Sequence, residues 1–140
     1  MKKKKIIHLI FAVVAVVSCR GRDYPELRQL FVEAGQMFRD YRLALEKADT
    51  AVSAVEVMKI FNPRIEEFIR KKEQIQEKYP ELKEIQRLRQ TCNQMEEFQT
   101  FRNDFSEFYK MGDAIARKFN QDKTFKAESL KGRALILRIF

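Results

Sequence analysis

The fold is decided by residues 82–119, which read LKEIQRLRQTCNQMEEFQTFRNDFSEFYKMGDAIARKF. Apolar side chains recur there at spacings of three, four or seven, the pattern of one face of an α-helix. They are Leu82, Ile85, Leu88, Cys92, Met95, Phe98, Phe101, Phe105, Phe108, Ile115 and Phe119. One helix over this range would be roughly 55–60 Å long at about 1.5 Å per residue. We therefore expect it either to overhang its neighbours or to bend near Gln99 and Thr100.

The same periodicity predicts two earlier helices. The first covers residues 25–47, and the second carries an apolar stripe from 52 to 79. Between them, Asp49, Thr50 and Ser53 offer side-chain oxygens that can cap the start of the second helix. Because such short connections join neighbouring helices, we expect antiparallel packing.

Two residues stand out within the second stripe. Pro63 removes a backbone donor, so we expect a kink just before it or, alternatively, a break into two helices. Lys72 falls on the apolar face, and its ammonium is expected to reach solvent at the end of its long side chain.

A shorter helix is predicted near the C-terminus, with Asp122 or Thr124 as its cap. Gly132 weakens it, and residues 134–140 are apolar enough to form a packed tail or a strand instead. The predicted fold class is all-α. Residues 25–140 are expected to form an antiparallel bundle of three long helices and a short C-terminal one, after an N-terminal signal helix.

The N-terminus has a different character from the rest of the chain. Four lysines at 2–5 precede an apolar run at 6–17 that only His8 interrupts, and Ser18 and Cys19 follow. A positive start, an apolar run of about 7–15 residues and a small residue before the cut make a secretory signal. The run is short for a spanning helix, which needs about 20 residues.

The residues Val16, Val17, Ser18 and Cys19 resemble the lipobox of bacterial lipoprotein precursors. The resemblance implies that a diacylglycerol is attached to Cys19 through a thioether and that the chain is cut between Ser18 and Cys19. It also implies acylation of the new amino terminus. Two or three acyl chains would hold the protein on a bilayer effectively irreversibly.

On this reading, residues 1–18 are the signal peptide and 19–24 are the lipidated cysteine and its tether. The alternatives are a plain secretory cut, a retained N-terminal anchor helix and an unmodified cytosolic cysteine. Arg20 follows Cys19 in place of the Asp that retains many enterobacterial lipoproteins at the inner membrane. By that analogy we expect a bacterial cell-envelope location, with the outer membrane favoured over the inner.

The exported part offers no recognisable catalytic constellation. The only histidine is His8, so imidazole is missing for nucleophilic triads, di-iron sites and ordinary zinc sites. Cys92 lies on the apolar stripe, and we expect it to be buried rather than reactive or paired between chains. Met37, Met58 and Met95 are interpreted as core residues. We therefore predict a non-enzymatic protein without a metal or cofactor.

The run Glu46-Lys47-Ala48-Asp49 resembles the first turn of the periplasmic four-helix haem cytochromes. Those proteins bind iron through a Met on the first helix and a His on the last. Met37 fits the first role, but the last helix of this chain has no His. The resemblance therefore implies a bundle without haem.

The formal charge of +8 is concentrated at the two ends of the chain. Half of it comes from the lysines at 2–5. From residue 114 onward there are two acidic residues and seven basic ones, which are Arg117, Lys118, Lys123, Lys126, Lys131, Arg133 and Arg138. Such a face suits anionic lipid headgroups, a polyanion or an acidic partner, or is simply a solvated helix face.

The resulting functional hypothesis is a membrane-anchored envelope lipoprotein whose bundle binds another protein of the envelope. Two alternatives remain open. One is a periplasmic chaperone or carrier for unfolded protein or lipid, which needs an open apolar groove. The other is a structural oligomer that self-associates through the overhanging part of the third long helix. Nucleic acid is not expected as a partner, because export separates the chain from it.

Overall fold

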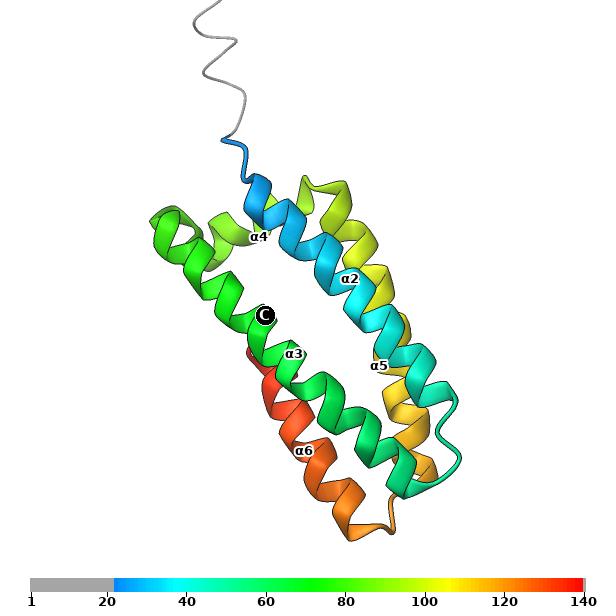
Figure 1. Cartoon of the computed structure of the whole chain (residues 1–140). Helices are drawn as coiled ribbons and strands as arrows, with labels where there is room; N and C mark the ends of the chain where they lie inside the picture. The colour runs from blue at the N-terminus through cyan, green and yellow to red at the C-terminus, as the bar shows by residue number, and fades with distance from the viewer. Residues whose placement is uncertain (1–21, 140) are drawn as a thin grey trace, which may run out of the picture.

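The computed structural model describes residues 22–139, and this part of the chain is helical without any strand. Its elements are α2 (Pro25–Glu46), α3 (Ala51–Lys78), the 3₁₀ helix η1 (Pro80–Lys83), α4 (Ile85–Asn93), α5 (Glu96–Lys118) and α6 (Lys123–Leu137). The four longer helices α2, α3, α5 and α6 form a bundle in which consecutive members run in opposite directions (Figure 1). The predicted all-α class is confirmed. The predicted signal helix lies outside the described residues.

The first two helices of the bundle lie where the periodicity predicts them. At the start of α3, Thr50 Oγ1 accepts a hydrogen bond from the Ser53 N–H at 3.1 Å. Ser53 Oγ accepts one from the Thr50 N–H, also at 3.1 Å, which completes a capping box. Helix α3 then continues through Pro63 to Lys78, so the alternative of two separate helices is wrong.

We expect Thr50→Ala to lower the free energy of unfolding by about 1 kcal/mol, because the first turn of α3 loses its side-chain acceptor. Urea unfolding followed by circular dichroism measures this change. Thr50→Asp keeps an acceptor at the cap and is expected to stay near wild type. An equal loss in the two variants would contradict the role of the cap.

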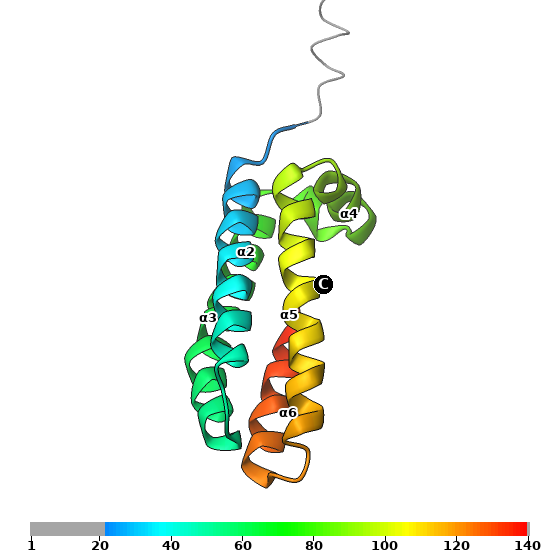
Figure 2. The same cartoon turned by 90° about the vertical axis from the view of Figure 1, so that its right-hand side faces the viewer.

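The single helix predicted over 82–119 is wrong. The chain instead forms η1, α4 and α5, and the last break falls at Gln94 and Met95 rather than near Gln99. There the Met95 N–H bonds the Cys92 carbonyl at 2.9 Å, which closes α4 with a turn. Helix α4 lies at the end of the bundle where α2 begins (Figures 1 and 2). Helix α5 is therefore about as long as α2 and has no overhang.

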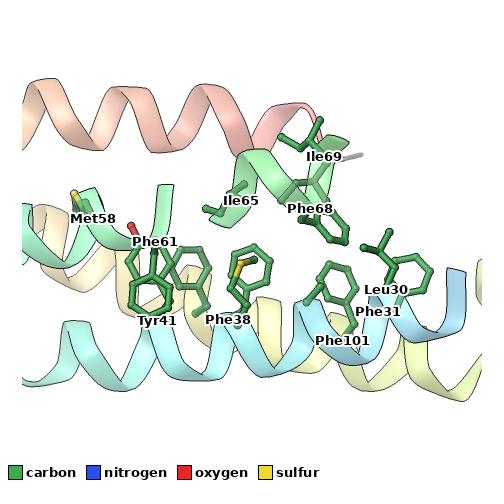
Figure 3. Close-up of a cluster of buried hydrophobic side chains, with 14 of the residues drawn as sticks. Leu30, Phe31, Phe38, Tyr41, Met58, Phe61, Ile65, Phe68, Ile69 and Phe101 are labelled. Atoms are coloured by element: carbon green, nitrogen blue, oxygen red, sulfur yellow. The ribbon is translucent and has the colours of Figure 1, made fainter. Parts of the chain in front are cut away.

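The core is built around aromatic rings shared between α2 and α5, which run side by side (Figure 2). Phe38 and Phe101 are completely buried, and Phe38 also contacts the rings of Phe105 and Phe108 at 5.1 and 4.9 Å. Apolar side chains of α3 cover these rings from one side (Figure 3). They include Met58, Phe61, Ile65, Phe68 and Ile69. The aromatic stripe of 82–119 thus packs within this core or against it.

Helix α6 packs against α3 and begins as predicted. Asp122 caps it by accepting a hydrogen bond from the Phe125 N–H at 2.7 Å. The helix runs to Leu137, so a strand over 134–140 is excluded for the described part of that segment. Gly132 is buried inside the helix and lets α6 approach α3 closely. A Cβ at Gly132 would lie 3.1 Å from Asn62 Oδ1.

Lys72 differs from the expectation of a side chain reaching into solvent. Its ammonium donates hydrogen bonds to the main-chain carbonyls of Arg138 and Ile139, at 3.0 and 2.9 Å. Arg138 is the C-cap of α6 and Ile139 follows it, so both carbonyls lie just past the last helical residue, Leu137. Half-buried Lys72 therefore fastens the end of α6 to α3, and the loss of hydration is offset by these bonds.

Candidate functional site

The sequence-predicted lipidation site, Cys19, and its cleavage partner Ser18 lie outside the described residues. The described chain begins shortly after them. Tyr24 is buried, its ring packs edge-on against Tyr79 at 5.0 Å, and its hydroxyl donates to Glu81 at 3.0 Å. The predicted tether therefore ends at a fixed point, at the end of the bundle where α2 begins and α3 ends.

A groove opens between α2 and α3 next to this point. It has a volume of about 620 Å³ and runs between the first two turns of α2 and the last turns of α3. Leu30 and Ile75, both core residues, contribute to its apolar lining. A second hollow of about 300 Å³ continues along the same two helices and shares Leu30 with the first. Together they make a channel that is open on one side, which we call the α2–α3 groove.

Two ion pairs cross the α2–α3 groove and join its rims. Glu26 of α2 pairs with Lys78 of α3 and also accepts a hydrogen bond from the Tyr79 hydroxyl at 2.9 Å. About two helical turns further along the groove, Glu33 of α2 pairs with Lys71 of α3 at 2.9 Å. The groove therefore presents an apolar floor beneath rims of both charges.

The rim contacts shift the titration of the acidic side chains. The hydrogen bond from the Lys78 ammonium is the main cause that lowers the pKa of Glu26 from 4.5 to about 2. The hydrogen bond from Lys71 lowers the pKa of Glu33 in the same way. Glu26 thus keeps its charge to a lower pH than a free carboxyl does, although both carboxylates are exposed enough for salt to screen the pairs.

This shift predicts how acid affects the pairing of α2 with α3. A carboxyl with a lowered folded-state pKa stabilises the fold fully above its unfolded pKa, and loses that contribution as the pH falls towards the folded value. For Glu26 the window runs from about 4.5 down to about 2. We expect the Tm of wild type to fall across this window and that of Glu26→Gln to fall less. Thermal unfolding between these pH values measures the difference.

Glu77→Gln is the matched control for this experiment. Glu77 is exposed on α3 and has no ion-pair partner in the part of the chain that the structure describes. Its variant should keep the wild-type dependence of Tm on pH. If Glu26→Gln also kept it, the pairing across the groove would contribute nothing to stability.

Cys92 is buried, as its place on the apolar stripe predicts. Its exposed fraction is 3%, and burial raises the pKa of its thiol to about 11, against the lesser opposing effect of Lys72. A thiol that stays protonated at neutral pH is a poor nucleophile and a poor metal ligand. Cys92 therefore serves packing in this fold.

The three methionines interpreted as core residues are also buried, and they belong to different parts of the chain. Met37 is on α2, Met58 on α3 and Met95 at the junction of α4 and α5. No group of three or more His, Cys, Asp or Glu side chains within residues 22–139 is arranged to hold a metal ion. Their burial supports the interpretation of these methionines as core residues.

Sequence reasoning missed a polar contact between α3 and α6. The Asn62 amide is buried and donates from Nδ2 to Glu128 at 3.1 Å, while its Oδ1 has no hydrogen-bond partner. Glu128 also raises the pKa of the buried Tyr41 hydroxyl, although desolvation of that hydroxyl is the larger cause. The sequence feature that could have revealed this contact is Asn62 itself, a polar residue at helical spacing from Met58 and Ile65 on the apolar stripe of α3. This contact fixes how α6 docks against α3.

Within residues 22–139, no helix combines the length and the apolar character needed to cross a bilayer. The described part of the chain thus offers a small helical bundle with an open, charged-rimmed groove beside the start of α2. Protein-family models, curated proteins and solved structures were compared with the chain, and none of them matches it.

Proposed function

We propose that this chain is a lipoprotein of the bacterial envelope, anchored through acyl chains on Cys19 after removal of residues 1–18. The observation that carries the proposal is the order of its first residues. The lysines at 2–5 precede an apolar run, and Val16-Val17-Ser18-Cys19 follows directly. Arg20 after the cysteine favours the outer membrane over the inner one.

The anchored domain is proposed to act without catalysis, as a module that binds a polypeptide segment of another envelope protein. The α2–α3 groove supports this role, because its volume of about 620 Å³ falls within the roughly 300–1,000 Å³ that is usual for binding pockets. Leu30 and Ile75 offer apolar contacts, and the paired charges of Glu26 and Lys78 offer polar ones at the rim. An apolar centre with a polar rim is the usual anatomy of a protein interface.

The groove would lie close to the membrane. Residues 20–24 connect Cys19 to the start of α2, and an extended chain spans at most about 3.5 Å per residue, or about 18 Å in all. Pro25 and Glu26 line the groove directly after this connection. A partner segment at the membrane surface would therefore be within reach.

The carrier alternative makes a different demand on the fold. A carrier needs an open apolar groove, whereas the α2–α3 groove is crossed by two ion pairs, and the centre of the bundle is filled by rings such as Phe38 and Phe101. The open groove suits a short peptide segment better than a whole acyl chain. Strong binding of a hydrophobic dye to the native domain would favour the carrier instead.

The structure removes the reason for expecting self-association through the third long helix, because that helix is broken and leaves no overhanging part. The aromatic stripe that prompted it packs against Phe31, Phe38 and Tyr41 of α2. A monomer in sedimentation at micromolar concentration is the expected result.

Photo-crosslinking in living cells tests the binding role. A photoreactive amino acid at Gln74, an exposed residue lining the groove, should give one adduct of constant mass with an envelope protein. The same group at exposed Gln121, between α5 and α6, is the matched control and should not give that adduct. Adding Gln29→Trp, which narrows the groove, should abolish the Gln74 adduct. Identical adducts from both positions, or none from Gln74, would contradict the proposal.

A further inference from the structure

Helix α6 has an apolar strip on the face that points away from the bundle. Leu130 and Leu137 are 65% and 82% exposed, and the exposed alanines Ala127 and Ala134 lie between and beside them. The four positions follow one another at spacings of three, four and three, so they share one side of the helix. The opposite side buries Phe125 and Gly132. The packing of α6 on the bundle therefore does not explain why its outer face is apolar.

Basic side chains border this strip on both sides. Lys126 and Arg133, seven residues apart, lie along one edge, and Lys131 and Arg138, also seven apart, lie along the other. All four are exposed. Lys126 and Arg133 have no ion-pair partner among residues 22–139.

In the described part of the chain, the acidic groups that face α6 pair with the basic residues of one edge only, Lys131 and Arg138, and Asp113 of α5 lines the same hollow as Arg133. Glu128 points inward, with only 12% of its side chain exposed, and holds Asn62 and Lys131. Glu73 of α3 pairs with Arg138 at 3.4 Å, and Asp122 is engaged as the N-cap. The surface around Leu130 and Leu137 is therefore apolar along its middle and net positive at its edges.

We propose that the outer face of α6 binds the surface of an anionic lipid bilayer. Leu130 and Leu137 would enter the boundary between headgroups and acyl chains. The long stems of the flanking lysines and arginines would lie along that boundary, with their charges at the phosphates. An acidic protein or a soluble polyanion would satisfy the charges but leave the apolar strip uncovered, which is why the bilayer is favoured.

The position of α6 relative to the tether suits this contact. Lys72 of α3 holds the end of α6, and Lys78 of α3 pairs with Glu26 at the start of α2. These two lysines are six residues apart, or about 9 Å along the helix axis. The C-terminal end of α6 therefore lies within about two helical turns, along the axis of α3, of the level at which α2 begins. The inference rests on the proposed function for the presence of a bilayer, but the contact itself needs no lipid on the protein.

Co-sedimentation with vesicles tests the contact on the chain lacking residues 1–19. The hydrophobic core described for residues 22–139 runs from Tyr24 to Ile139, so the shortened chain retains all of it, and circular dichroism checks its helix content. We expect it to bind vesicles of phosphatidylcholine mixed with phosphatidylglycerol and to bind phosphatidylcholine alone much more weakly. Leu130→Gln with Leu137→Gln leaves the charge unchanged and should weaken binding to the mixed vesicles about tenfold or more.

Val32→Gln with Leu43→Gln is the matched control, since both residues are exposed on α2, at 50% and 45%. This pair should bind the mixed vesicles as wild type does. Lys126→Gln with Arg133→Gln should weaken binding and reduce its sensitivity to salt.

Two outcomes would overturn the inference. One is unchanged binding of the Leu130 and Leu137 double variant to the mixed vesicles, which would identify a site that recognises polyanions by charge alone. The other is an equal loss in the control pair. Failure here leaves acylation of Cys19 untouched, and a chain without acylation can still bind the vesicles, so the two proposals fail separately.

Discussion

Cells expressing Cys19→Ala are expected to show no fatty-acid label on this protein, whereas wild type is labelled after growth with radioactive palmitate. The reason is chemical, because the thioether to diacylglycerol forms only on the thiol at the cleavage position. Without that step the leader should remain on the chain. The labelled band and its electrophoretic size report both effects in one experiment.

Cys92→Ala is the matched control for this prediction. It removes the other cysteine, which is buried in the bundle and protonated at neutral pH. The variant should be labelled as strongly as wild type, apart from any loss of protein through reduced stability. Label that survives Cys19→Ala and disappears with Cys92→Ala would place the acyl group on the wrong residue for an N-terminal anchor.

Phe38→Ala is expected to lower the free energy of unfolding by about 3–5 kcal/mol. Phe38 is fully buried and contacts three rings of α5, at centroid distances of 4.9 to 6.0 Å. Alanine would leave a cavity between α2 and α5 that rigid neighbours cannot fill. Because small domains are stable by only about 5–15 kcal/mol, this single change should bring the bundle near its limit.

Urea unfolding followed by circular dichroism measures this loss, and Val32→Ala on the same helix is its control. Half of the Val32 side chain is exposed, so its truncation should change stability by about 0.5 kcal/mol or less. Phe38→Leu should fall between the two, since leucine fills part of the space. Equal effects of Phe38→Ala and Val32→Ala would mean that the α2–α5 rings are not the core.

The starts of three helices could be predicted from the sequence, because each has a proline or a capping side chain at its N-terminus. Pro25 opens α2, Thr50 caps α3 and Asp122 caps α6, and each signal acts within one turn of its helix. Apolar periodicity then located most of the buried face. Val52 is an exception, because it lies at the edge of the α3 stripe and remains exposed.

The break between α4 and α5 could not be predicted, for a geometric reason. Cys92, Met95 and Phe98 are spaced by three residues, so the stripe continues across the turn as if one helix ran through it. Periodicity records which side is apolar and carries no information on a change of direction. The turn lets α4 fold across the end of the bundle, and Ile85 on the same stripe stays exposed as a result.

The candidate site depended even more on tertiary structure. Glu26 and Lys78 are 52 residues apart and meet only because α2 and α3 form an antiparallel pair. The burial of Cys92 could be predicted, since its neighbours at helical spacing are apolar. The buried pairing of Asn62 with Glu128 could not, because it needs the close approach that Gly132 allows.

The intact mass of the protein isolated from its native membrane tests the central claim most directly. The account predicts a chain that begins at Cys19 and is heavier than residues 19–140 by a diacylglyceryl group and an amide-linked acyl chain. A chain that still begins at Met1, with an unmodified thiol at position 19, would contradict it.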